Sequence, residues 1–233
     1  MRFETPLIPG VLLRRYKRFL ADVRLEDGRE VTAHTANTGS MRTCAEPGSQ
    51  VWLSHHGDPK RKLAYTWEIS QSAGTWVGIH TQRANRLAEE AIAQGAIPSL
   101  VGYTHIRREV SYGKNSRVDL LLQAQGHPDC LVEVKNVTLV QAGQALFPDA
   151  VTERGARHLE ELMLQVAQGN RAVMLFVVQR TDAQTFAPAD DIDPHYGKLL
   201  RQAKASGVEV LAWDFWVSPE EIRIRQALKL DLP

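Results

Sequence analysis

The chain has 233 residues, of which 43% are hydrophobic and 24% charged, with 16 glycines and 11 prolines. This ordinary globular composition excludes collagen-like, low-complexity and disordered chains, and the length predicts one or two domains with a sizeable core. The net charge of +1 excludes a strongly basic chain, but residues 1–80 carry 11 basic against 8 acidic residues, so any attraction to phosphate must be local and begin there.

Three further features bear on the compartment. The longest apolar run, residues 172–178, has seven residues, whereas a membrane span needs about 20. Glu4 and Pro6 interrupt the opening of the chain before any apolar stretch, unlike a signal peptide. Cys44 and Cys130 lie far apart and show no metal-ligand spacing. We therefore expect a cytoplasmic protein without a membrane partner.

Residues 1–80 have the pattern of β-structure. Apolar and polar residues alternate over 19–25, and Asp27-Gly28 signals a tight hairpin. Further strands are expected at residues 31–35, 50–54, 63–70 and 75–80. Five short strands in a segment of this length favour a small OB-like β-barrel as the first domain, residues 1–80.

The pattern changes near residue 81, where we place the start of a second domain, residues 81–233. A helix over 81–94 is indicated by apolar residues at helical spacing and by Gly95 after them. The later elements are expected in this order: strands at 107–112, 117–124 and 129–139, a helix at 152–168, a strand at 171–180, a helix at 195–206, a strand at 208–217 and a last helix from Ser218. This order predicts an α/β domain with a mixed sheet, whose nearly all-apolar strand at 171–180 is covered on both faces.

The hairpin of 117–124 and 129–139 brings two acids together. If its turn is centred on Gly126, Asp119 lies opposite Glu133, and Arg117 lies opposite Lys135. Side chains alternate along a strand, so these four share one face. The other face, toward the core, would then carry Val118, Leu120, Val132 and Val134.

Two facing carboxylates repel each other, so a positive charge must compensate them. One alternative is a salt-bridged surface in which Arg117 and Lys135 supply that charge. The other is Mg²⁺ or Mn²⁺ held between Asp119 and Glu133, because hard cations take oxygen ligands. Lys135 would then lie beside the attacking water or the scissile phosphate and stabilise developing charge.

Side chains on two helices can complete this site. A further carboxylate can come from Glu89 or Glu90 on the first helix, and the helical wheel does not separate them. On the helix after Lys135, Arg154, Arg157 and His158 can face the same pocket and bind phosphate. The alternative for all of them is an ordinary solvated helix surface.

Two basic clusters in the first domain predict contact with nucleic acid. One interleaves cations with aromatic residues, so that bases can stack while cations follow the phosphates; it consists of Arg14, Arg15, Tyr16, Lys17, Arg18 and Phe19. The other is a loop with His55, His56, Lys60, Arg61 and Lys62. The alternative is a basic edge that deters strand aggregation.

Six segments of the chain resemble a known family. They are RYKRF at 15–19, NTGSM at 37–41, NRL at 85–87, RVD at 117–119, EVKNVTL at 133–139 and FPDAVTERG at 147–155. Together they resemble the sugar fermentation stimulation protein family (SfsA) of bacteria and archaea, over nearly the full length of the chain.

The resemblance implies an N-terminal OB-like barrel followed by a domain similar to the PD-(D/E)xK nucleases, and binding to DNA without sequence preference. It assigns the site roles to Asp119, Glu133 and Lys135, and the helix carboxylate to Glu90, with Glu89 as the alternative. The leading hypothesis is hydrolysis of phosphodiester bonds with Mg²⁺ or Mn²⁺. The rival is a non-catalytic DNA-binding regulator of sugar (maltose) metabolism genes. DNA against RNA, single against double strand, and a homo-oligomeric state stay open.

Overall fold

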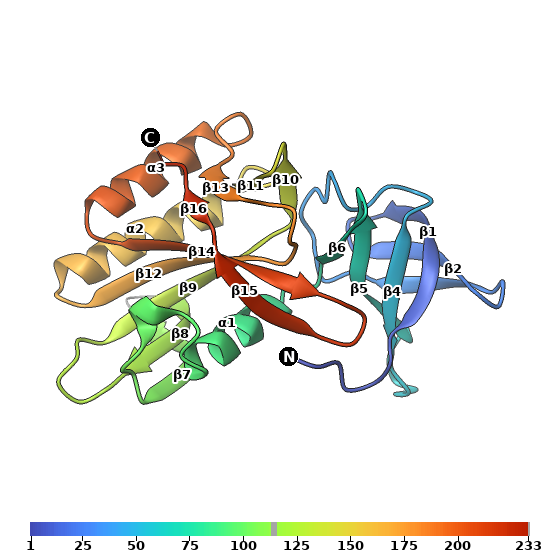
Figure 1. Cartoon of the computed structure of the whole chain (residues 1–233), viewed down its shortest axis with the longest axis horizontal. Coiled ribbons are helices and arrows are strands. Elements are labelled where there is room, and N and C mark those ends of the chain that lie inside the picture. Colours follow the sequence, from blue (N-terminus) through green and yellow to red (C-terminus); the bar gives the residue numbers. More distant parts are fainter. Residues whose placement is uncertain (113–115, 233) are drawn as a thin grey trace.

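The computed structural model describes residues 1–112 and 116–232, which form two lobes, a β-barrel and an α/β domain (Figure 1). The strands of the barrel sheet are β1 (Ile8–Tyr16), β2 (Leu20–Leu25), β3 (Glu30–His34), β4 (Gln50–His55), β5 (Tyr65–Ser72) and β6 (Thr75–Gly78). Their order is β3-β2-β1-β4-β5-β6, and a parallel β3–β5 pairing closes the barrel. Leu12, Val23 and Trp67 are fully buried inside it.

Strand β1 was not expected from the sequence, although the other barrel strands were. Its apolar residues do not alternate, and Pro9 and Gly10 interrupt them. Gly10 is needed for close packing of β1 against β2, since a Cβ there would lie 2.6 Å from Val23 Cγ1 and 2.9 Å from the Arg24 carbonyl oxygen. A glycine that interrupts a strand pattern can therefore mark a close backbone approach rather than a loop.

The second lobe contains a six-stranded mixed sheet, β15-β14-β12-β9-β8-β7, and a four-stranded sheet, β10-β11-β13-β16. The elements are α1 (Arg83–Ala93), a 3₁₀ turn (Pro98–Leu100), β7 (His105–Tyr112), β8 (Ser116–Gln123), β9 (Cys130–Val137), β10 (Leu139–Gln141), β11 (Gln144–Phe147), α2 (Glu153–Ala167), β12 (Arg171–Val178), β13 (Thr185–Pro188), α3 (Pro194–Ala205), β14 (Glu209–Val217), β15 (Ile222–Ala227) and β16 (Lys229–Leu230). None of the helices in the described ranges is long and apolar enough to cross a membrane.

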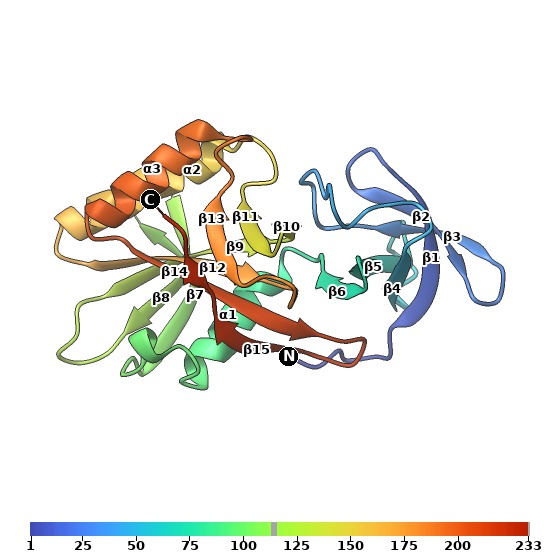
Figure 2. The same cartoon turned by 45° about the horizontal axis from the view of Figure 1, so that its top comes forward.

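Helices cover both faces of the six-stranded sheet, with α1 on one face and α2 and α3 on the other (Figure 2). The central strand β12 pairs in parallel with β9 and β14. Its side chains enter the two cores in turn: Val173 and Leu175 pack on the α1 side, whereas Met174 and Phe176 pack on the α2 side. The expectation of a strand covered on both faces is confirmed.

The helix expected from Ser218 is wrong. Ser218 Oγ accepts hydrogen bonds from the backbone N–H groups of Glu220 and Glu221, both at 3.2 Å, as a helix N-cap would. The chain then turns back as β15, antiparallel to β14. Ile222 and Ile224 alternate with arginines, and this period of two matches a strand better than a helix.

The strand expected over 129–139 is divided. β9 ends at Val137, and Leu139 begins β10, which belongs to the smaller sheet. The four strands of that sheet are only two to four residues long, which is too short to show a clear alternation of apolar and polar residues. This sheet was therefore missed.

A buried ion pair joins the two lobes. Glu68 of β5 is 1% exposed, and both of its carboxylate oxygens accept hydrogen bonds from Arg83 of α1 at 2.6 Å. Ser54 Oγ donates to the same carboxylate at 2.8 Å. Burial alone would raise the pKa of Glu68, but the Arg83 hydrogen bonds and the nearby charges of His80 and Arg83 outweigh burial and lower it. The start of α1 is thereby fixed to the barrel.

We expect Arg83→Met to lower the free energy of unfolding by about 3–5 kcal/mol, because it leaves a buried carboxylate without its charged partner. Urea titration at pH 7 measures the loss. Arg29→Met is the matched control: it removes the partner of the exposed Asp27, and loss of an exposed pair should leave the urea midpoint almost unchanged.

The cost should also depend on pH. Because the folded pKa of Glu68 is lowered, the pair stabilises the protein above the ordinary glutamate pKa and loses this effect as the pH falls through the lowered value. Adding Glu68→Gln to Arg83→Met should recover part of the stability at pH 7. A double variant less stable than Arg83→Met would contradict this account.

Candidate active site

The two acids of the hairpin lie where β8 and β9 separate. The β8–β9 pairing ends at Leu120 and Val132, in the register expected for a turn centred on Gly126. Beyond this point the Asp119 side chain replaces a backbone acceptor, since the backbone N–H of Val134 donates to Asp119 Oδ2 at 2.8 Å. The strands therefore form a fork at the acidic pair.

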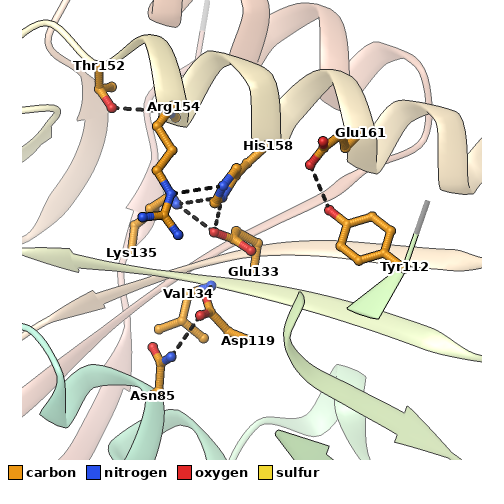
Figure 3. Close-up of polar contacts among 11 residues, drawn as sticks. Asn85, Tyr112, Asp119, Glu133, Val134, Lys135, Thr152, Arg154, His158 and Glu161 are labelled. Atoms are coloured by element: carbon orange, nitrogen blue, oxygen red, sulfur yellow. Dashed lines mark hydrogen bonds and ion pairs between the residues drawn. The ribbon is translucent and has the colours of Figure 1, made fainter. Parts of the chain in front are cut away.

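The fork changes the expected division of faces. Val118 packs in the core under α2, whereas Leu120 belongs to the core under α1. Asp119 Oδ1 accepts a hydrogen bond from Asn85 Nδ2 of α1 at 2.8 Å, and Glu133 points toward α2 (Figure 3). The prediction that Val118 and Leu120 share a face is wrong, and the two carboxylates approach the fork from its α1 and α2 sides.

Glu133 is held by two side chains that can carry positive charge. Lys135 Nζ donates to Glu133 Oε1 at 2.7 Å, and His158 Nδ1 of α2 contacts the same oxygen. The Glu133 side chain is only 3% exposed. Burial alone would raise its pKa, but the His158 hydrogen bond and the Lys135 charge lower it below its usual value. Glu133 is therefore ionised at neutral pH.

The pKa of Asp119 is shifted in the opposite direction to that of Glu133. Burial and the negative charge of Glu133 raise the pKa of Asp119, against the lowering effects of the Val134 N–H, the Lys135 charge and the Asn85 amide. The two carboxylates are thus close enough for their charges to interact. A cation bound between them would relieve this repulsion.

The donor set fits a hard divalent cation. Within the described part of the chain, Glu133 Oε2 is buried without a hydrogen-bond partner, and such an oxygen is suited to bind a metal ion. Among the described residues, no three His, Cys, Asp or Glu side chains are grouped to hold a metal, so the protein offers two carboxylates. This number suits Mg²⁺, which is commonly bound by one or two carboxylates and retains several waters.

The structure does not bring Glu90 or Glu89 into contact with this pair. Glu90 bonds to Arg86 at 3.0 Å and to the terminal ammonium group of Met1 at 2.8 Å, and Glu89 pairs with Arg108. Asn85, one turn earlier on α1, makes the contact with Asp119 instead. The available signal was its place in the NRL segment that carries the family resemblance.

The basic residues expected beside the acids are separated by the fold. His158 and Lys135 lie at Glu133, with 3.2 Å between Lys135 Nζ and His158 Nδ1. Arg154 is exposed one turn earlier on α2, and its Nε lies 3.3 Å from His158 Nε2. Arg117 is exposed on β8.

In the first basic cluster of the barrel, Arg15 binds backbone carbonyl groups of its own lobe. Its guanidinium group donates to the carbonyl oxygens of Arg18, Asn37, Gly39 and Ser40 at 2.7–3.3 Å. This side chain therefore holds the loop that follows β3 in a fixed shape.

Its neighbours in the same cluster are partly engaged as well. Arg14 Nε and the Tyr16 hydroxyl both donate to Asp22, at 2.8 and 3.1 Å, and Arg18 donates twice to the Thr38 carbonyl oxygen, at 3.0 and 2.8 Å. Lys17 is exposed at the turn. The second cluster is freer, since Lys60, Arg61 and Lys62 are all exposed in the loop between β4 and β5.

Comparison with known proteins gives the same family over both lobes. Residues 13–79 match the SfsA N-terminal OB domain, and residues 82–221 match the sugar fermentation stimulation protein RE domain. A sugar fermentation stimulation protein homolog from Geobacter sulfurreducens is 60% identical, covering 98% of this chain and 97% of its own. The homolog from Shewanella baltica is 56% identical, covering 97% of this chain and 98% of its own.

A solved structure shares the whole architecture. Pyrococcus furiosus SfsA, solved in complex with Ca²⁺, is 30% identical to this chain and superimposes with a TM-score of 0.89, covering 99% of this chain and 98% of its own. The predicted fold class is confirmed: an OB-like barrel is followed by an α/β domain with a mixed sheet.

We expect Asp119→Asn to raise the Tm at pH 7 without divalent ions, because it removes a like charge beside Glu133. A gain of about 0.5–1 kcal/mol corresponds to about 1–4 °C for a chain of this size. The gain should disappear as the pH falls, since the raised pKa means that the Asp119 carboxyl is already protonated at low pH. An Asp119→Asn protein that melts lower than the parent at pH 7 would contradict this.

Mn²⁺ should raise the Tm of the parent protein, since a ligand that binds only the folded state stabilises it by about 2.7 kcal/mol at 100 times its Kd. Asp119→Asn and Glu133→Gln should each lose most of this shift. Asp27→Asn, in the exposed β2–β3 turn, should keep it. Differential scanning fluorimetry against Mn²⁺ concentration gives the comparison, and an equal shift in all four proteins would place the ion elsewhere.

Proposed function

The chain belongs to the sugar fermentation stimulation protein family, and we propose that it is a DNA-binding protein with a metal-dependent phosphodiesterase site. The site is the fork between β8 and β9, with Asp119 and Glu133 as ligands of Mg²⁺ or Mn²⁺ and Lys135 as the catalytic cation. The domain division at residue 80 separates two roles, since the barrel binds DNA and the α/β domain hydrolyses it.

One observation carries this proposal: a buried, ionised Glu133 keeps one carboxylate oxygen without a partner beside a second carboxylate of raised pKa. A purely structural acid of this kind would be expected to have both oxygens satisfied. The relative solved with Ca²⁺ supports a hard-cation site in this architecture, because Ca²⁺ also takes oxygen ligands.

Hydrolysis joins the oxygen of a water molecule to phosphorus and breaks one bond between phosphorus and an ester oxygen. The water loses a proton, and the departing oxygen gains one. When bound, Mg²⁺ or Mn²⁺ would polarise the phosphate and favour ionisation of water.

Lys135 supplies the cation that would act on the phosphate. Its ammonium group has three N–H donors, and Glu133 Oε1 accepts one at 2.7 Å. The remaining N–H groups can donate to phosphate oxygens, where they stabilise the charge that develops in the transition state. Because Glu133 orients Lys135 and is itself bonded to His158, this geometry exists before DNA binds.

Binding of DNA is supported by the match to an OB domain and by the basic surface of the barrel. The exposed cations of the two clusters, Lys17, Lys60, Arg61 and Lys62, can neutralise phosphates without reading sequence. Such binding weakens steeply with salt, since each neutralised phosphate releases counterions.

The second candidate function is a non-catalytic DNA-binding regulator of sugar metabolism genes. One feature favours it: α1 presents Asn85 rather than a carboxylate to the fork, and the cation Lys135 already bonds to Glu133 beside His158. Such a fork carries its own positive charge beside Glu133. The two candidates share the barrel and differ only in turnover.

Cleavage of labelled DNA with Mg²⁺ or Mn²⁺ separates the candidates. The parent protein should cut DNA, and Lys135→Ala should reduce the rate about 100-fold or more, as expected for loss of a group that stabilises transition-state charge. Lys204→Ala, which removes an exposed cation at the end of α3, is the matched control and should cut at the parent rate. If the parent and Lys135→Ala show the same residual cleavage, the phosphodiesterase function is excluded and the non-catalytic regulator remains.

A further inference from the structure

A cleft between the lobes lies beside the fork. This cleft has a volume of about 330 Å³. Lys135 and Asn85, the partners of Glu133 and Asp119, line it from the α/β domain, and Thr38 lines it from the barrel. A phosphate at Lys135 would therefore have one neighbouring nucleotide inside the cleft.

Hydrogen bonds join the two walls of this cleft directly. Asp149, in the loop after β11, accepts from the backbone N–H of Met41 at 3.1 Å and from Ser40 Oγ at 3.2 Å. Ser40 Oγ also lies 2.8 Å from the Asp149 carbonyl oxygen. We call these contacts of Ser40 and Met41 with Asp149 the clasp.

The clasp is tightly built on both sides. A Cβ on Gly39 would lie 2.6 Å from Asp149 Oδ2, so the barrel loop approaches Asp149 as closely as a glycine allows. Arg15 binds the carbonyl oxygens of Gly39 and Ser40 from behind. The walls of the cleft cannot part without breaking the clasp.

The size of the cleft favours a single strand. A volume of about 330 Å³ lies at the small end of the range for sites that enclose one drug-sized ligand, which is the scale of one nucleotide. In a duplex, each nucleotide carries its pairing partner and the second backbone with it. With the clasp closed, a cleft of this volume holds one nucleotide, and the second strand would have to lie outside it.

The chemistry of the lining agrees with its size. Residues with amide or hydroxyl side chains line the cleft from both lobes, among them Asn37, Thr38, Thr81, Asn136 and Thr152. Such groups can hydrogen-bond to the pairing edges of an unstacked base, which are occupied in a duplex. Lys135 and Arg18 add positive charge for the backbone.

We propose that the site acts on single-stranded DNA, with one unpaired nucleotide seated in the cleft between the barrel and the α/β domain. The proposal rests on the phosphodiesterase function proposed above. Duplex DNA binds the outer basic surface of the barrel but does not reach Lys135 unless it is locally opened.

Two circular DNAs of the same sequence test the proposal, one single-stranded and one a covalently closed, relaxed duplex, each with Mn²⁺ and the parent protein. Circles have no ends that can fray. The single-stranded circle should be cut at least about tenfold faster, as expected when only one of two substrates fits the site. Equal cutting, or faster cutting of the duplex circle, would overturn the proposal and leave the phosphodiesterase function intact.

Variants of the clasp residues give a second test of the proposal. Asp149→Ala should reduce the ratio of the cutting rates of the single-stranded and duplex circles, because it removes the hydrogen bonds that hold the two walls of the cleft together. Ser40→Ala keeps the acceptor Asp149 and should have a smaller effect. Asp27→Ala, an acid of the same lobe as Ser40 but in the exposed β2–β3 turn, should keep the parent ratio, and an unchanged ratio in Asp149→Ala would count against the clasp as the cause.

Absence of cutting on both circles would overturn the phosphodiesterase function. In that case, DNA binding tests whether the cleft accepts an unpaired nucleotide. Fluorescence anisotropy with Ca²⁺ should show that a single-stranded oligonucleotide binds the parent protein more tightly than its hairpin duplex, and that Thr38→Trp, which fills the cleft, removes this difference. Equal affinity of the two oligonucleotides would overturn the inference.

Discussion

The whole site depends on one hydrogen bond, from the backbone N–H of Val134 to the side chain of Asp119. A buried backbone N–H must find an acceptor, and here a carboxylate serves where the neighbouring strand would normally supply a carbonyl group. The substitution ends the ladder between β8 and β9 and sends Val118 to the opposite core. The resulting fork lets the two acids approach a common space from its α1 and α2 sides.

The local parts of this arrangement could be predicted from the sequence, because turn chemistry and residue periodicity are local signals. The glycine-centred turn gave the correct pairing of Leu120 with Val132, and the apolar run at β12 gave a strand covered on both faces. The fork itself could not be predicted, since strand alternation assumes an unbroken ladder. The contact of Asn85 with Asp119 depends on how α1 is rotated, and the helical wheel fixes only its apolar stripe.

The charged residues of the barrel show a second limit of prediction from the sequence. A run of cations near the start of the chain has the composition of a nucleic-acid surface, yet Arg15 is occupied by four carbonyl groups of its own lobe. Composition cannot distinguish a guanidinium group that binds phosphate from one that binds backbone, since both partners are oxygen acceptors. The loop that Arg15 holds lies against Asp149 of the other lobe, so the effect of this residue reaches beyond the barrel.

Internal neutralisation of Glu133 has a consequence for how such a family can diversify. Lys135 and His158 both bond to the buried acid from the α/β domain, so part of the charge balance at the fork is supplied by the fold itself. A lineage could lose its chemistry through changes at the fork while retaining both lobes and their surfaces. Descendants with the same shape can thus differ in whether they catalyse at all, and shared ancestry alone is a poor guide to turnover.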